Sequence, residues 1–100
     1  MEDREYLIIL YDYYGELLSD IQREYFEQYY FDNLSLAEIS ENDGKSRNAI
    51  HKCIKSSSSK LYEYEDKLRL YEKRKKLDNI LDKLSYYVGL SILTYLYTLR

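Results

Sequence analysis

The chain has 100 residues, 45% of them hydrophobic, with no proline, three glycines and 14 tyrosines. This length allows one domain with a modest core, and the absence of strand-like alternation predicts an all-α fold. One histidine, one cysteine and no glycine-rich phosphate loop argue against an enzyme, an internal disulfide or a metal centre, so no cofactor is expected.

The net charge of −3 hides a strong asymmetry along the chain. Residues 1–44 carry 12 acidic and 2 basic side chains, whereas residues 45–76 carry 11 basic and 4 acidic ones. A basic block of this kind is typical of a surface that faces anions. Attraction between acidic and basic helices would also explain it.

The N-terminal stretch "MEDREYLIIL" has acids where a secretory signal needs positive charge. We therefore expect a cytoplasmic protein. The first helix is expected over residues 6–18, because apolar side chains recur there at spacings of three and four. Gly15 should weaken its last turn.

Two capping boxes predict the starts of the next two helices. In "SDIQ" the Ser19 hydroxyl can accept a free backbone N–H while Gln22 reaches back, and in "SLAE" Ser35 and Glu38 repeat the arrangement. The second helix should close by Asn33, where "FDN" follows its apolar face.

The third and fourth helices are joined by a turn typical of a helix-turn-helix. The third helix should end before Gly44, which can take a positive φ without strain, and Ser46 should cap the fourth. In this register Ile39, Ile50 and Cys53 face inward and lock one helix across the other. For Cys53 we expect a buried thiol and no reactive role.

The same register turns five polar side chains outward. Arg and Asn can pair with guanine and adenine edges, and Lys can neutralise phosphates, so these residue types suit a nucleic-acid contact. A merely solvated helix face is the alternative reading. The candidate binding residues are Arg47, Asn48, His51, Lys52 and Lys55.

Two linked segments carry a family resemblance. "LLSDIQREYFEQYYFDNLSLAEISENDGKSRNAI" resembles the C-terminal (region 4) helix-turn-helix domain of sigma factors, and together with "SKLYEYEDKLRLYEKRKKL" it is more similar still to the YlxM family of small helix-turn-helix proteins. The resemblance covers residues 7–77. It implies an all-α fold and an accessory or regulatory role in the signal recognition particle targeting pathway.

The chain departs from the usual pattern at the turn itself. Asp43 and Lys45 flank Gly44 at positions where such motifs place apolar residues, and burying either charge unpaired would be costly. Two readings stay open: a looser turn, or side chains that both reach solvent.

We expect a helix-turn-helix core domain over residues 1–58 and a C-terminal helical extension over residues 59–100. The serine run "KSSSSK" has middling helix propensity and predicts continuity or a short kink. An apolar stripe then continues at helical spacing. Its members are Leu77, Leu81, Leu84, Val88, Ile92, Tyr95 and Leu99.

The apolar side chains of the stripe need a surface to pack against, and the sequence allows three such surfaces. The uncharged span from residue 84 to residue 99 is 16 residues long, shorter than the roughly 20 needed to cross a bilayer. The stripe could fold back on the first helices, pair with a second copy, or lie on a membrane surface. We predict a homodimer through this stripe.

Three functional hypotheses follow. The first is an accessory protein of the signal recognition particle pathway that binds RNA, DNA or particle proteins. The second is a sequence-specific transcriptional regulator, and the third is a protein adaptor in which the helix-turn-helix is only a scaffold. Salt-dependent binding to nucleic acid separates the first two from the third.

Overall fold

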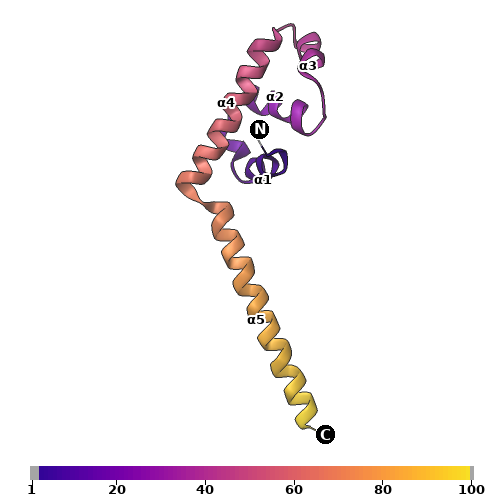
Figure 1. The fold of residues 1–100 in the computed structure, drawn as a ribbon, viewed down its shortest axis with the longest axis vertical. Helices are drawn as coiled ribbons and strands as arrows, with labels where there is room; N and C mark the ends of the chain where they lie inside the picture. The colour runs from indigo at the N-terminus through magenta and orange to yellow at the C-terminus, as the bar shows by residue number, and fades with distance from the viewer. Residues whose placement is uncertain (1–2, 100) are drawn as a thin grey trace. The chain divides into compact units, whose positions relative to one another are not determined.

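The computed structural model describes residues 3–99, and those residues form helices joined by short turns. The predicted all-α fold is therefore confirmed. The chain divides into two compact units, Met1–Arg69 and Leu70–Arg100. The helices, shown in Figure 1, are α1 (Arg4–Tyr14), the 3-10 turn η1 (Gly15–Leu17), α2 (Asp20–Tyr30), α3 (Leu36–Asp43), α4 (Arg47–Leu68) and α5 (Leu70–Thr98).

Both predicted capping boxes form. The Ser19 hydroxyl accepts the Gln22 N–H at 3.3 Å, and the Gln22 side chain accepts the Ser19 N–H at 3.1 Å. At α3, Ser35 and Glu38 make the equivalent pair at 3.1 and 3.2 Å. Each box satisfies backbone donors that a helix start otherwise leaves unpaired, and so fixes where α2 and α3 begin.

The first helix is shorter than the sequence predicts. It ends at Tyr14 and tightens into η1, so residues 15–17 are helical but no longer α-helical. Gly15 is buried at this junction, and a Cβ there would lie 3.0 Å from the ring of Tyr11. The glycine thus leaves room for the Tyr11 ring at the point where the α-helix ends.

The core of the first unit forms where α1, α2 and α3 each pack against α4 (Figure 1). Two serines at the centre of α4, Ser57 and Ser58, are fully buried. Their hydroxyls donate to the carbonyls of Cys53 and Ile54 at 2.9 and 3.1 Å, so their burial leaves no unpaired hydroxyl. The fully buried apolar side chains are Leu7, Leu10, Tyr14, Phe26, Ile39, Ile50 and Leu61.

Helix α4 continues through the serine run without a break, as predicted. The boundary expected after residue 58 falls inside this helix, and Leu61, beyond it, is fully buried in the first unit. α4 ends where Arg69 takes a left-handed conformation with φ 54°. The two compact units divide at that residue.

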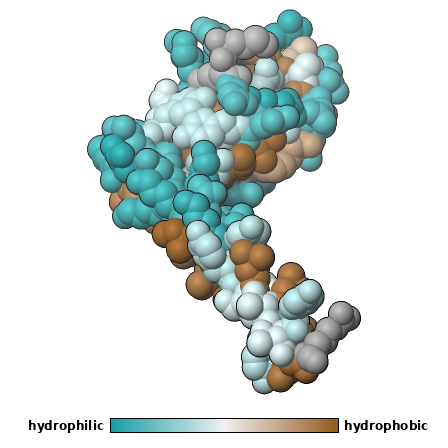
Figure 2. All heavy atoms as spheres, turned by 60° about the horizontal axis from the view of Figure 1, so that its bottom comes forward, coloured by the Kyte–Doolittle hydropathy of each residue, from teal (hydrophilic) through white to brown (hydrophobic). Residues whose placement is uncertain are grey.

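Helix α5 forms the second unit and has no buried residue. Its basic first half holds ion pairs one turn apart, Arg74 with Asp78 at 3.1 Å and Lys76 with Glu72 at 3.7 Å. Its second half carries leucine, isoleucine, valine and tyrosine side chains in solvent, and Figure 2 shows hydrophobic side chains along it. Within residues 3–99, none of the helices combines the length and the hydropathy of a membrane-spanning segment.

Candidate nucleic-acid interface

The turn between α3 and α4 has the predicted form. Gly44 lies in the left-handed region with φ 74°, and its N–H donates to the carbonyl of Ser40 at 2.9 Å. The Ser40 hydroxyl donates to the carbonyl of Lys45 at 2.5 Å, across the turn. Ser46 then caps α4 by accepting the Ala49 N–H at 3.2 Å. These bonds hold the start of α4 in place relative to α3.

The side chains expected to lock the two helices face inward, though not equally. Ile39 and Ile50 are fully buried, as predicted. Cys53 is only half-buried, so the expectation of a buried thiol was too strong. Burial nevertheless raises the pKa of the Cys53 thiol, which disfavours the reactive thiolate.

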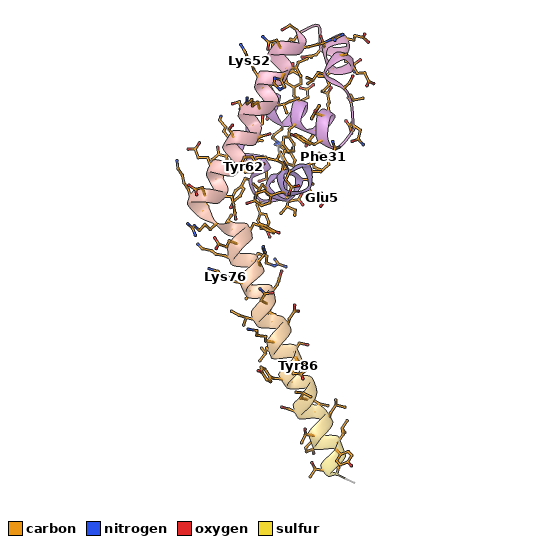
Figure 3. The ribbon with its side chains drawn as sticks, in the orientation of Figure 1. Glu5, Phe31, Lys52, Tyr62, Lys76 and Tyr86 are labelled. Atoms are coloured by element: carbon orange, nitrogen blue, oxygen red, sulfur yellow. The ribbon has the colours of Figure 1, made fainter. Side chains whose placement is uncertain are left out.

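All five predicted contact residues lie on the exposed side of α4. Lys52 extends into solvent on the side away from α3 (Figure 3). Together these side chains give the first turns of the helix a cationic surface that also carries amide and imidazole hydrogen-bonding groups. Such a surface can meet phosphates and base edges alike. Its members are Arg47, Asn48, His51, Lys52 and Lys55.

The two charged residues beside Gly44 both reach solvent, which decides between the two readings of the turn. Asp43 accepts a hydrogen bond from the Tyr25 hydroxyl, and the Lys45 ammonium lies 5.6 Å from the centre of the Tyr25 ring. Tyr25 is itself buried, with 2% of its surface exposed. Its pKa is raised, first by burial and then by the bond to Asp43. α2 thus supplies the partner that lets the turn keep both charges.

Sequence reasoning missed a cleft beside this face. The cleft has a volume of about 440 Å³ and is lined by residues of all four helices of the first unit. His51 and Lys55 of the exposed face line the cleft, and so does Arg4 of α1. The signal in the sequence was slight: Arg4 is one of only two bases among residues 1–44.

The described part of the chain contains no cluster of three or more His, Cys, Asp or Glu side chains that could hold a metal ion. His51 is exposed and Cys53 half-buried on the same helix. Their spacing of two residues points their side chains in different directions.

Comparison with known proteins identifies the group to which this architecture belongs. Residues 1–89 match the UPF0122 family, described as "Putative helix-turn-helix protein, YlxM / p13 like". A UPF0122 protein of Clostridium kluyveri is 47% identical over 78 residues, which are 78% of this chain and 70% of the relative. One of Symbiobacterium thermophilum is 39% identical over 84 residues, covering 84% of this chain and 78% of the relative.

A third relative, the UPF0122 protein UUR10_0158 of Ureaplasma urealyticum, is 44% identical over 77 residues, or 77% of this chain and 78% of the relative. The family match includes the capped helices, the turn at Gly44, all of α4 and most of α5, because it runs to residue 89. The predicted resemblance is thereby confirmed. The chain belongs to the UPF0122 family of YlxM/p13-like helix-turn-helix proteins.

Proposed function

We propose that this protein is a non-catalytic, cytoplasmic binding protein that contacts nucleic acid through the exposed face of α4. The observation that carries the proposal is the placement of Arg47, Lys52 and Lys55 in solvent on the helix that follows the turn. In helix-turn-helix proteins that second helix is the one that enters a groove. Lys45, exposed at the turn, adds a further cation beside its N-terminus.

The five side chains have different roles in the proposed contact, according to their chemistry. The lysines act as point charges for phosphates, which positions the protein on the backbone. Arg47 and Asn48, in the first turn, have planar groups that can make paired hydrogen bonds to base edges. Binding through the lysines alone would be insensitive to sequence and strongly dependent on salt.

We further propose that the stripe of α5 pairs with a second copy of the chain. Its seven side chains are between 48% and 67% exposed, and each would contribute about 1.5 to 3 kcal/mol if buried. From Leu77 to Val88, each member of the stripe recurs 11 residues later. An 11-residue repeat runs almost parallel to the helix axis and favours a slightly right-handed pairing. A two-fold dimer would present two cationic faces.

A role in the signal recognition particle pathway rests on the resemblance to the YlxM family alone. The partner in that pathway would be the particle's RNA or one of its proteins. Capture of the tagged protein from lysate, with and without nuclease, tests this role when RNA and proteins are both identified. Recovery of particle components that depends on intact RNA supports it, and their absence from both samples contradicts it.

Binding to defined nucleic acids tests the broader proposal. Fluorescence anisotropy with random-sequence duplex DNA and with structured RNA, each at several salt concentrations, should show affinity that falls as salt rises. A strong preference for one duplex sequence would favour a transcriptional regulator instead. No binding to any nucleic acid at low salt would contradict the proposal. The protein would then be a protein adaptor, with α5 as its docking element.

A further inference from the structure

The cleft beside α4 has basic side chains in its lining. Arg4 comes from α1, while His51 and Lys55, one turn apart, come from α4. None of the residues that line the cleft is acidic, although the first 44 residues of the chain are rich in acids. The cleft therefore suits an anionic group.

The remaining walls are aromatic and aliphatic. Tyr29 and Tyr30 close one side, with their rings 5.0 Å apart and nearly perpendicular at 88°. Leu36 and the buried Ile54 complete the lining. Side chains of these types offer a flat apolar body a surface to lie on.

The basic and aromatic parts are held together before any ligand binds. Arg4 Nη2 donates to the carbonyl of Tyr30 at 2.5 Å and also to the side chain of Asn33. The guanidinium carbon lies 5.5 Å from the centre of the Tyr30 ring. Both hydrogen bonds are donated by the same guanidinium nitrogen of Arg4. The guanidinium group has three nitrogens and carries five N–H donors in all. A prearranged cation beside an aromatic wall costs less entropy on binding than a mobile one.

We propose that this cleft binds one nucleotide, with the base against Tyr29 and Leu36 and the phosphate near Arg4 and Lys55. A volume of about 440 Å³ is within the range of small-molecule sites. Guanidinium and ammonium groups are the usual partners of phosphate, and bases stack on aromatic side chains whatever their sequence. A planar base joined to a phosphate satisfies both halves of the lining.

The cleft is continuous with the proposed interface, because His51 and Lys55 belong to both. An unpaired nucleotide at the end of a strand on α4 can therefore enter it. In that form the inference rests on the proposed function and makes it more specific, since it predicts a preference for unpaired nucleotides. A free mononucleotide offers the same chemistry, and the experiment has to separate the two sources.

The test compares four probes by anisotropy or calorimetry: a blunt duplex, the same duplex with a short single-stranded extension, free AMP or UMP, and inorganic phosphate. Leu36→Trp fills the cleft, and Tyr29→Ala removes the aromatic wall. Lys52→Ala is the matched control, since Lys52 is exposed on the same helix and does not line the cleft. Circular dichroism shows which variants keep their helices.

Wild-type protein should bind the extended duplex at least about fivefold more tightly than the blunt one, the lower end of what stacking one base contributes. Leu36→Trp or Tyr29→Ala should remove this preference and leave blunt-duplex affinity unchanged, while Lys52→Ala should weaken both probes equally. Binding of the free nucleotide alone would support the cleft as a nucleotide site and contradict the proposed function.

Other outcomes overturn the inference. Equal affinity for the two duplexes without mononucleotide binding would remove the nucleotide site and leave the proposed function standing. A preference that persists in both folded cleft variants would place the unpaired base elsewhere. Binding of inorganic phosphate as tight as that of the nucleotide would reduce the cleft to an anion site, and no binding of any probe would contradict both proposals.

Discussion

The Tyr14 hydroxyl donates a 2.6 Å hydrogen bond to Glu65 Oε1, joining α1 to the second half of α4 across 51 residues of sequence. Both side chains are buried, at 0% and 8% exposure. The bond lies beyond the serine run, in the part of α4 that sequence reasoning assigned to the C-terminal extension. It ties this part of α4 to the first unit, which extends to Arg69.

Replacing Tyr14 with Phe should therefore destabilise the first unit. The change keeps the ring and removes the hydroxyl, so the expected loss is about 1 to 3 kcal/mol, typical of removing one partner of a buried hydrogen bond. Urea unfolding followed by circular dichroism measures the change. Tyr97→Phe is the control, because Tyr97 is 78% exposed on α5 and its replacement should cost little. Equal stability of the two variants would show that the Tyr14 bond contributes nothing.

The raised pKa of Tyr25 predicts a loss of stability in alkali. Burial raises it most, the bond to Asp43 adds to the rise, and Lys45 opposes it. The pKa of Tyr25 in the folded protein lies above the ordinary value of 10.0. The contribution of Tyr25 to the free energy of unfolding is therefore complete below about pH 10 and is lost as pH rises through the folded pKa. The difference in unfolding free energy between wild type and Tyr25→Phe should therefore shrink above about pH 10.

Unfolding in urea between about pH 8 and about pH 11 measures this difference. Tyr97→Phe serves as the control, since Tyr97 is 78% exposed on α5. Its profile should follow that of the wild type at every pH. A Tyr25→Phe profile that stays parallel to the wild type throughout would rule out this residue as the titrating group.

A charge between α3 and α4 should unfold the first unit. Ile39 and Ile50 are fully buried, so Ile39→Asp or Ile50→Asp places a carboxylate without a partner in the core, at a cost of about 3 kcal/mol or more. Ile21→Asp is the matched control, because Ile21 is 40% exposed in the first turn of α2, where an acid is tolerated. Cooperative thermal unfolding of the core variants near the wild-type temperature would refute the packing described for the turn.

Pairing through α5 predicts a dimer that two acidic substitutions dissociate. Leu84→Glu with Val88→Glu puts like charges in the centre of the stripe, and sedimentation equilibrium should then show a monomer whose first unit stays folded. Tyr87→Glu with Thr94→Glu changes exposed residues off the stripe and should leave the dimer intact. A wild-type protein that is monomeric at tens of micromolar would contradict the proposal.

Local signals in the sequence predicted much of the fold. The Ser19 and Ser35 boxes and Gly44 act on neighbouring backbone groups, so residue type and spacing were enough to place the starts of α2 and α3 and the turn. The exposed face of α4 followed from the same register. Features that depend only on residues three or four apart can be read from one sequence.

Contacts between distant residues could not be predicted in this way. Nothing in the sequence pairs Tyr25 with Asp43, which are 18 residues apart, or places Arg4 beside Tyr30, 26 residues away. The bond between Tyr25 and Asp43 explains how the turn accommodates a charged residue. The contact between Arg4 and Tyr30 forms part of the lining of the cleft. Both depend on how α1, α2 and α3 pack, which is decided by the core as a whole.

The salt dependence of nucleic-acid binding by a triple variant is the sharpest test of the proposed contact through α4. Arg47→Ala, Lys52→Ala and Lys55→Ala together should weaken binding to duplex DNA or RNA. The slope of log affinity against log salt concentration should become shallower by about 2 to 3, because fewer counterions are released when three phosphate contacts are lost. The matched control, Lys73→Ala with Lys75→Ala and Lys76→Ala, removes the same charge from exposed positions on α5. We expect a shallower slope for the α4 variant and a nearly unchanged slope for the α5 variant. Wild-type affinity and slope in the folded α4 variant, or equal losses in the two, would contradict the proposed contact.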